Sequence, residues 1–143
     1  MNMTNKQIRR WAAAVAAICL LTLFLPLYGM TAFAATARIA FSDPTASVGS
    51  EINVKMKITS SDNLSTADIM LAYDPGSLEF IEGTNAEGGN GAVRVHGDGG
   101  GANTTTLAYD LKFKASAAGT SKITVTSQEI YDASSQIVTV DKQ

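Results

Sequence analysis

The chain has 143 residues, of which 45% are hydrophobic, and its formal net charge is −2. All thirteen acidic residues but only eight of the eleven basic ones follow residue 34, so residues 35–143 carry a net charge of −5. An acidic domain lacks the basic face that nucleic acids or anionic membranes require, which argues against both as partners.

The first 34 residues have the pattern of a secretory signal peptide. Three basic residues precede an apolar run over Trp11–Leu27, and Ala32-Phe33-Ala34 provides the small side chains of a cleavage site. We therefore expect residues 1–34 to be a signal peptide helix that is cleaved, and the protein to be secreted, extracellular or at a bacterial cell surface. The alternative is an uncleaved anchor, because an apolar run of this length can span a bilayer. This leader is the only membrane association that the sequence predicts.

Residues 35–143 have the length of one domain with one core. The only cysteine, Cys19, and the only tryptophan, Trp11, both precede them. The mature domain is therefore expected to contain neither disulfides nor reactive thiols.

Alternation of apolar and polar residues predicts β-strands through most of this domain. It is clearest in Glu51–Thr59, where Ile52, Val54 and Met56 share one face. In chain order the predicted strands are Ala37–Phe41, Glu51–Thr59, Ala67–Tyr73, Leu78–Ile81, Ala92–His96, Leu107–Lys114, Lys122–Thr126 and Ile137–Val140.

Glycine and proline separate these strands. Asp74-Pro75-Gly76 is typical of a tight turn, and the glycine-rich stretches Glu82–Gly91 and Asp98–Asn103 are predicted to be loops. Short strands that each have one apolar face must bury that face against a second sheet. The sequence therefore predicts an all-β fold, an antiparallel β-sandwich.

Few residues are suited to catalysis. The single histidine, His96, and the absence of cysteine after Cys19 exclude a Cys–His pair and a site with several histidines. His96 lies two residues before Asp98, but no serine has the sequence of a nucleophile elbow, and strand parity makes His96 an exposed strand-end residue.

The carboxylates are better explained as surface and turn residues than as an acid pair for glycoside hydrolysis. The four that we considered are Asp68, Asp74, Glu79 and Glu82. Asp98 and Asp132 lack the alternating acidic spacing of a calcium loop. The sequence therefore predicts no enzyme, no metal site and no cofactor.

Val48-Gly49 within Thr45–Val54, Tyr73-Asp74-Pro75 at the end of Ala67–Pro75, and the strand Leu78–Ile81 follow one another along the chain. In this order they resemble the motifs of cohesin domains, the dockerin-binding modules of cellulosomes. Thr45–Val54 resembles their opening, where a Val-Gly turn leads into an alternating strand. Ala67–Pro75 resembles their third strand, which ends in Tyr-Asp-Pro, and Leu78–Ile81 resembles the strand that follows. Weaker similarity continues through Leu107–Val140.

The resemblance implies a cohesin-like domain over residues 35–143, with a jelly-roll topology close to the immunoglobulin type and about eight or nine strands. It implies a non-catalytic module that binds a dockerin-bearing protein, with calcium on the dockerin rather than on this chain. Such a module anchors or assembles polysaccharide-degrading proteins on a scaffold or cell surface.

The resemblance also implies where a dockerin binds. In cohesins the binding face includes the third strand and the strand that corresponds to Ala92–Asp98. Asp68 falls on an acidic position that hydrogen-bonds the dockerin helix, and Thr66 falls on its polar neighbour. Strand parity independently turns these two residues outward, together with a flexible methionine that suits a contact surface. The expected partner-binding residues are Thr66, Asp68, Met70, Arg94 and His96.

Two departures from the family pattern concern this face. Only a short glycine-rich link joins Ile81 to Ala92, where many cohesins have another strand. Arg94 and Gly97 also stand where the family has apolar and acidic contacts.

A carbohydrate-binding or adhesive surface sandwich that meets no dockerin is the alternative function, with polysaccharide as its partner. Sugar platforms need exposed aromatic rings. Strand parity turns Tyr73, Tyr109 and Phe113 inward. Only Phe41 and Tyr131 then remain as loose candidates for exposed sugar-binding rings.

Overall fold

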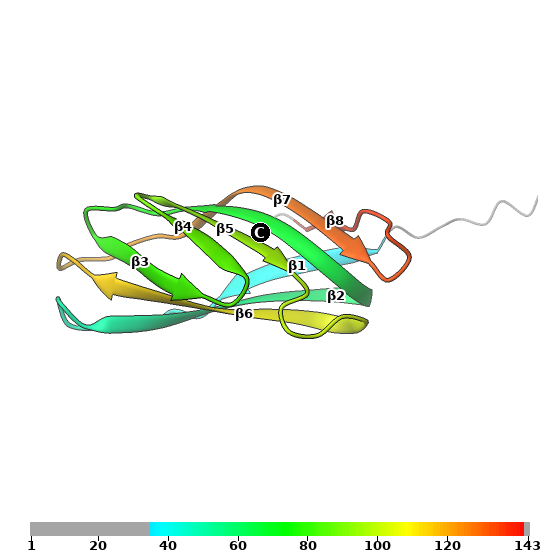
Figure 1. The fold of residues 1–143 in the computed structure, drawn as a ribbon, viewed down its shortest axis with the longest axis horizontal. Helices are drawn as coiled ribbons and strands as arrows, with labels where there is room; N and C mark the ends of the chain where they lie inside the picture. The colour runs from blue at the N-terminus through cyan, green and yellow to red at the C-terminus, as the bar shows by residue number, and fades with distance from the viewer. Residues whose placement is uncertain (1–34, 142–143) are drawn as a thin grey trace, which may run out of the picture. The chain divides into compact units, whose positions relative to one another are not determined.

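The computed structural model describes residues 35–141, which form an all-β unit (Figure 1). The predicted signal peptide, residues 1–34, lies outside the described residues. In chain order the strands are β1 (Thr36–Phe41), β2 (Glu51–Ala72), β3 (Leu78–Gly83), β4 (Ala86–Gly89), β5 (Ala92–Gly97), β6 (Thr104–Ala115), β7 (Thr124–Asp132) and β8 (Thr139–Val140). Within the described residues, no helix is long and apolar enough to span a membrane.

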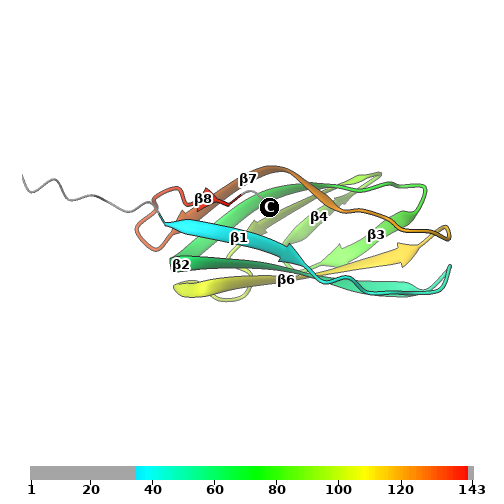
Figure 2. The ribbon, with the colours of Figure 1, turned by 180° about the vertical axis from the view of Figure 1, so that it is seen from behind.

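The strands form two layers, and β2 belongs to both. Its first half pairs with β1 and β6, whereas its second half pairs with β5 and β7. One layer therefore has the order β8-β1-β2-β6-β3 and the other the order β4-β5-β2-β7, and β3 and β4 connect them (Figures 1 and 2). Every named pair is antiparallel except β1 with β8, which is parallel. The predicted antiparallel sandwich of jelly-roll type is confirmed.

β2 joins two strands that the sequence predicted separately. The pairing with β7 shifts register between Leu64 and Thr66, so Ser65 is an extra residue in β2. Buried positions are accordingly even-numbered up to Leu64 and odd-numbered from Ala67 onward. A bulge turns the following side chains to the opposite face without ending the strand. The apolar–polar alternation therefore changes phase at Ser65, although β2 continues through that residue as one strand.

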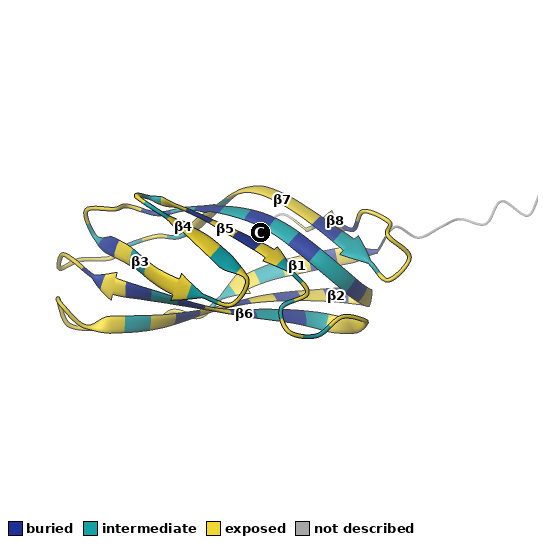
Figure 3. Ribbon diagram, in the orientation of Figure 1, coloured by how far each residue is buried: buried dark blue, intermediate teal, exposed yellow. Residues whose placement is uncertain are grey.

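The core between the layers contains the aromatic residues that parity turned inward. Tyr109 and Phe113 are fully buried, and Tyr73 is 7% exposed. The ring of Phe113 meets those of Tyr73 and Phe80 edge to face, at centroid distances of 5.2 and 5.5 Å. Figure 3 shows the resulting alternation of buried and exposed positions along the strands.

The turn predicted at Asp74-Pro75-Gly76 is present. The Asp74 carboxylate accepts the Ser77 hydroxyl at 2.6 Å and the Gly76 N–H at 2.9 Å. These hydrogen bonds favour the ionised form and lower the pKa of Asp74. Asp74 is therefore a turn residue, which is the role that the sequence favoured over an acid for catalysis.

The prediction of a loop over Glu82–Gly91 is wrong, because this stretch contains β4. β4 pairs with β5 through the two-residue turn Asn90-Gly91, whose φ angles are 54° and 93°. Positive φ angles at both central residues define a type I′ turn, whose twist matches that of the paired strands. Asn-Gly is a preferred sequence for this turn. The link from Ile81 to Ala92 thus includes a strand, contrary to the departure inferred from the sequence.

β7 is longer than predicted, because its alternation also changes phase at a bulge. Leu71 is opposite Val125, but Met70 is opposite Ser127, so Thr126 is the extra residue. The Thr126 hydroxyl donates to the Met70 carbonyl at 3.2 Å. Beyond the bulge, odd-numbered residues of β7 point away from the core.

Candidate protein-binding face

The outer surface of the layer β4-β5-β2-β7 brings together polar side chains from four strands. We call it the four-strand face and define it by Thr66, Asp68, Met70, Glu87, Arg94, His96, Ser127, Glu129 and Tyr131. The strand register arranges most of these residues in two rows. One row is Glu87, Arg94, Met70 and Ser127, and the other is His96, Asp68 and Glu129.

All five residues predicted to bind a partner lie on this face. On β2, Thr66, Asp68 and Met70 are half-buried, while the residues between them are buried. On β5, Arg94 and His96 are exposed and flank the fully buried Val95. The outward placement inferred from strand parity is therefore confirmed, whereas their role in binding stays a prediction.

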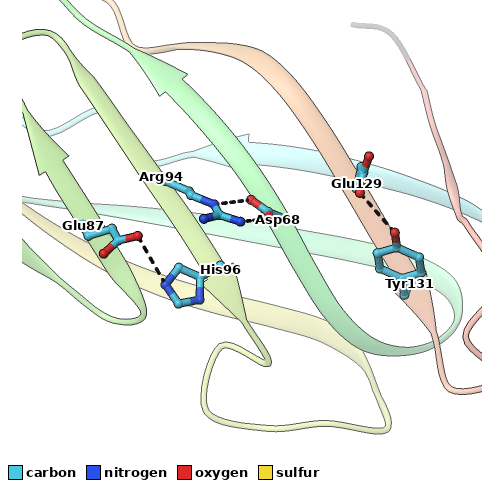
Figure 4. A network of polar contacts seen from close by, with 6 residues as sticks. All are labelled: Asp68, Glu87, Arg94, His96, Glu129 and Tyr131. Atoms are coloured by element: carbon cyan, nitrogen blue, oxygen red, sulfur yellow. Dashed lines mark hydrogen bonds and ion pairs between the residues drawn. The ribbon is translucent and has the colours of Figure 1, made fainter.

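Asp68 and Arg94 form a two-pronged ion pair at the centre of the face (Figure 4). Arg94 Nε donates to Oδ1 of Asp68 at 3.0 Å, and Nη2 donates to Oδ2 at 2.5 Å. Hydrogen bonding by the guanidinium, helped by its charge, lowers the pKa of the Asp68 carboxyl. A carboxylate has about four acceptor positions, so Asp68 can still accept hydrogen bonds from a partner.

His96 contacts Glu87 rather than Asp98. Its Nε2 lies 3.9 Å from Oε1 of Glu87, which β4 supplies (Figure 4). The Asp98 carboxylate instead accepts the N–H of Gly100 at 3.0 Å, within its own loop. The geometry therefore does not assemble the His96–Asp98 pair that a catalytic triad would need.

Sequence reasoning missed four members of the face, Glu87, Ser127, Glu129 and Tyr131. Glu87 was assigned to a loop, although Asn90-Gly91 is a strong hairpin signal that would have placed it opposite Arg94. Glu129 and Tyr131 lie beyond the predicted end of their strand, because the bulge at Thr126 interrupts the alternation.

Glu129 and Tyr131 interact with each other on β7. The Tyr131 hydroxyl donates to Oε2 of Glu129 at 3.1 Å (Figure 4). This hydrogen bond and the negative charge of Glu129 stabilise the neutral phenol and raise the pKa of Tyr131.

The outer surface of the other layer has cross-strand ion pairs. Lys112 Nζ lies 2.6 Å from Glu82 and 3.9 Å from Glu51, and Lys55 lies 3.4 Å from Asp110. Hydrogen bonding to Lys112 lowers the pKa of Glu82. Glu82 is therefore a member of a solvated ion pair rather than a raised-pKa acid of the kind that glycoside hydrolysis needs.

A cleft of about 610 Å³ opens at one end of the sandwich, between the β1–β2 and β6–β7 loops. Phe41 and Ile123 contribute apolar surface to it, and Ser121 contributes a buried hydroxyl without a hydrogen-bond partner. None of the residues of the four-strand face lines this cleft.

The two aspartates considered for calcium use carboxylate oxygens within their own loops. Oδ1 of Asp132 accepts the N–H groups of Ser134 and Gln136, at 2.8 and 2.9 Å. Across residues 35–141, no three His, Cys, Asp or Glu side chains are grouped to hold a metal ion.

Comparison with known proteins identifies similar solved structures. No family model matches the sequence, and the search of curated proteins gives no match. The sixth cohesin of scaffoldin B from Acetivibrio cellulolyticus, solved in complex with a Cel5 dockerin mutant, is similar with a TM-score of 0.62 at 19% identity. The match covers 74% of this chain and 93% of that one.

Two further similar structures come from other organisms. A non-cellulosomal cohesin of the archaeon Archaeoglobus fulgidus has a TM-score of 0.59 at 22% identity, over 75% of this chain and 84% of that one. A cohesin in a type I cohesin–dockerin complex from Clostridium thermocellum has a TM-score of 0.60 at 16% identity, over 73% and 94%. The described domain therefore has a cohesin-like fold, as the sequence motifs predicted.

Proposed function

We propose that residues 35–143 are an exported, non-catalytic, cohesin-like module that binds a dockerin-bearing protein through the four-strand face. The observation that carries the proposal is the position of Asp68. It lies outward at the centre of that face, in a cohesin-like fold, at the position where the sequence motifs imply a contact with the dockerin helix. Two of the similar cohesins were solved in complex with dockerins, which supports the same class of partner.

The chemistry of Asp68 suits such a contact. Arg94 keeps the carboxylate ionised and holds it in one orientation. A preoriented acceptor loses less conformational freedom when a partner binds. Met70 and Thr66 lie beside it on β2 and supply adaptable apolar surface and a hydroxyl.

The biological role follows from the predicted signal peptide. An exported module that captures dockerins would anchor or assemble polysaccharide-degrading proteins outside the cell, on a scaffold or at the cell surface. The calcium of such a complex belongs to the dockerin. Because a non-cellulosomal cohesin is among the similar structures, the proposal does not require a cellulosome.

Direct carbohydrate binding has weaker support. Its two loose aromatic candidates lie apart, because Phe41 lines the end cleft and Tyr131 belongs to the four-strand face. A platform for a flat polysaccharide needs several rings on one surface. Retention of the purified domain on insoluble polysaccharide would nevertheless favour this alternative.

Calorimetry against the dockerin modules encoded in the same genome, in the presence of calcium, tests the proposal. We expect at least one dockerin to bind and Asp68→Ala to weaken that binding by about 1.5–3 kcal/mol, roughly ten- to a hundredfold, because a charged hydrogen bond is lost. Asp110→Ala is the matched control, since it removes an ion-paired aspartate from the opposite layer. Its affinity should equal that of the unmodified domain.

Two results would contradict the proposal at different levels. Failure of every dockerin to bind would refute the function itself. Equal losses from Asp68→Ala and Asp110→Ala would refute the four-strand face as the site while leaving dockerin binding intact.

A further inference from the structure

The end cleft shares no residue with the four-strand face and has an apolar floor. Its volume of about 610 Å³ lies within the range of about 300–1,000 Å³ that is usual for ligand sites. Val54, Leu78 and Ala115 are buried at its base. Val48, which is 56% exposed, adds apolar surface at the rim. The cleft is therefore a recess with an apolar base and an accessible apolar rim.

One wall of the cleft contains an unpaired edge of β1. Ser42 donates its N–H to the Lys55 carbonyl at 2.9 Å, so the even-numbered residues here hydrogen-bond with β2. Odd-numbered residues face the opposite edge, where the Ala37 carbonyl accepts the N–H of Asp141 and where the named pairing with β8 ends. The same edge reaches Phe41 in the cleft, whose N–H and C=O have no partner within residues 35–141.

The β6–β7 loop, which also lines the cleft, has an unpaired backbone as well. Residues 117–123 all line the cleft, and within the described part of the chain none of them forms a backbone hydrogen bond. The Ser121 hydroxyl is buried there without a hydrogen-bond partner. A buried hydroxyl without a partner is unfavourable, so a ligand that pairs with it gains affinity.

These features favour an extended peptide as the occupant. An open strand edge offers donors and acceptors that an added strand satisfies, and alternate side chains of that strand can enter an apolar recess. A sugar is less suitable, because Phe41 is the only aromatic ring in the lining. The charged residues of the lining are one acid and one base, Asp43 and Lys122, so the cleft selects no net charge.

We propose that the end cleft binds an extended, uncharged peptide segment of a partner protein, which adds as a strand to the edge of β1 at Phe41. Its apolar side chains pack on Val54 and Leu78, and its main chain hydrogen-bonds the Ser121 hydroxyl. This second site is separate from the four-strand face and does not depend on the proposed binding of a dockerin.

Fluorescence polarisation of short peptides tests strand addition to the mature domain. The probes are hexapeptides with both ends neutral and a dye at one end, in which threonine alternates with valine, leucine or phenylalanine. At least one should bind. Methylating the backbone nitrogens of alternate residues removes donors but keeps the side chains. At least one of the two methylation patterns should weaken binding roughly tenfold. Unchanged affinity with both patterns would refute strand addition.

The location of the site is tested by Val48→Asp, which places a charge on the apolar rim and should weaken peptide binding roughly fivefold. Ile137→Asp is the matched control, because Ile137 is 68% exposed and does not line the cleft. Its affinity should stay within about twofold of the unmodified domain. If no peptide binds, or if the two variants bind equally well, the inference is refuted and the proposed function stands.

The contact with Ser121 is tested by Ser121→Ala, which should weaken peptide binding roughly two- to tenfold. The melting temperature without peptide should stay constant or rise, because an unpaired buried hydroxyl is removed. Ser134→Ala, in an exposed turn outside the cleft, should change neither quantity. A fall in melting temperature for Ser121→Ala would mean that Ser121 supports the fold, and would refute its role as a ligand contact.

Two further measurements distinguish other occupants. Val48→Asp should leave dockerin affinity unchanged, and an equal loss of dockerin and peptide binding would refute a separate site. Sedimentation velocity detects a second copy of the chain in the cleft. A concentration-dependent dimer that Val48→Asp abolishes and Ile137→Asp leaves intact would refute a partner peptide. Matching circular dichroism spectra establish that each variant is folded.

Discussion

At the scale of single residues, Tyr109 links β5 to β6. Its ring is fully buried, and its hydroxyl donates to the Gly97 carbonyl at 2.8 Å, where β5 ends. Burial, with a smaller contribution from the negative charge of Asp98, raises the pKa of Tyr109 to about 12. The hydroxyl therefore remains a donor well beyond the pH at which an exposed tyrosine ionises.

Tyr109→Phe should lower the free energy of unfolding at neutral pH by about 1 kcal/mol, because the part-buried hydrogen bond to the Gly97 carbonyl is lost. Urea denaturation followed by circular dichroism measures the difference. Tyr73→Phe provides a comparison, since it removes a hydroxyl from a residue that packs against the same Phe113 ring. If both substitutions lower the free energy of unfolding equally, the hydrogen bond from Tyr109 to Gly97 adds no stability beyond that of an ordinary tyrosine hydroxyl.

The same residue predicts how stability depends on alkaline pH. Because its pKa is raised in the folded state, Tyr109 stabilises the fold below pH 10, and this contribution is lost as pH rises from about 10 to about 12. A two-unit shift corresponds to about 2–3 kcal/mol. The advantage over Tyr109→Phe should therefore disappear or reverse near pH 12. If the difference in the free energy of unfolding between the unmodified domain and Tyr109→Phe stays constant from pH 8 to pH 12, the raised pKa of Tyr109 is not its cause.

At the scale of elements, the hairpin of β4 and β5 depends on glycine. Gly88 and Gly89 have φ angles of 147° and 150°, a conformation that side chains disfavour. A Cβ on Gly88 would lie 2.3 Å from the Ala92 carbonyl oxygen, whereas a Cβ on Gly89 would have nothing within 4 Å. The two positions therefore differ in steric contact rather than in backbone geometry.

Gly88→Ala should destabilise the domain by more than about 2 kcal/mol, because the steric clash adds to the backbone strain. Gly89→Ala should lower the free energy of unfolding by the backbone strain alone, on the order of 1 kcal/mol. Urea denaturation of both variants measures the difference. If Gly88→Ala and Gly89→Ala lose the same free energy of unfolding, β4 can move away from β5 without an energetic cost. β4 would then not hold Glu87 on the four-strand face.

At the scale of the whole described domain, β2 makes the two layers dependent on each other. A single strand pairs with β1 and β6 in one layer and with β5 and β7 in the other. Fully buried Leu64 lies where β2 passes between the layers. One layer can therefore hardly unfold without disrupting the other.

We expect residues 35–143 to unfold in one cooperative transition, with the same urea midpoint by circular dichroism and by tyrosine fluorescence. Leu64→Ala should lower the free energy of unfolding by about 2–5 kcal/mol, as buried leucine truncations do, and should shift both midpoints equally. Separate midpoints, or a shift of only one, would show that the layers unfold independently.

Strand parity predicted much of the candidate face correctly. Thr66, Asp68 and Met70 lie within one uninterrupted stretch of alternation, so their outward direction could be inferred from the spacing of Ala67, Ile69 and Leu71 alone. The same reasoning failed for Glu129 and Tyr131, because the bulge at Thr126 changes the phase of the alternation within β7. A local pattern carries no information about where a neighbouring strand forces an extra residue.

By itself, the sequence determined the class of fold, the buried aromatic core and the outward side of each regularly alternating strand. Period-two alternation depends only on the geometry of a single extended chain, and turn residues act through their own φ angles. Only the tertiary structure decided that Glu87, Arg94, Asp68 and Glu129 share one face, that Arg94 pairs with Asp68, and that Tyr131 donates to Glu129. Those outcomes depend on the register between strands that are distant in sequence, which the long bent β2 and its bulges set.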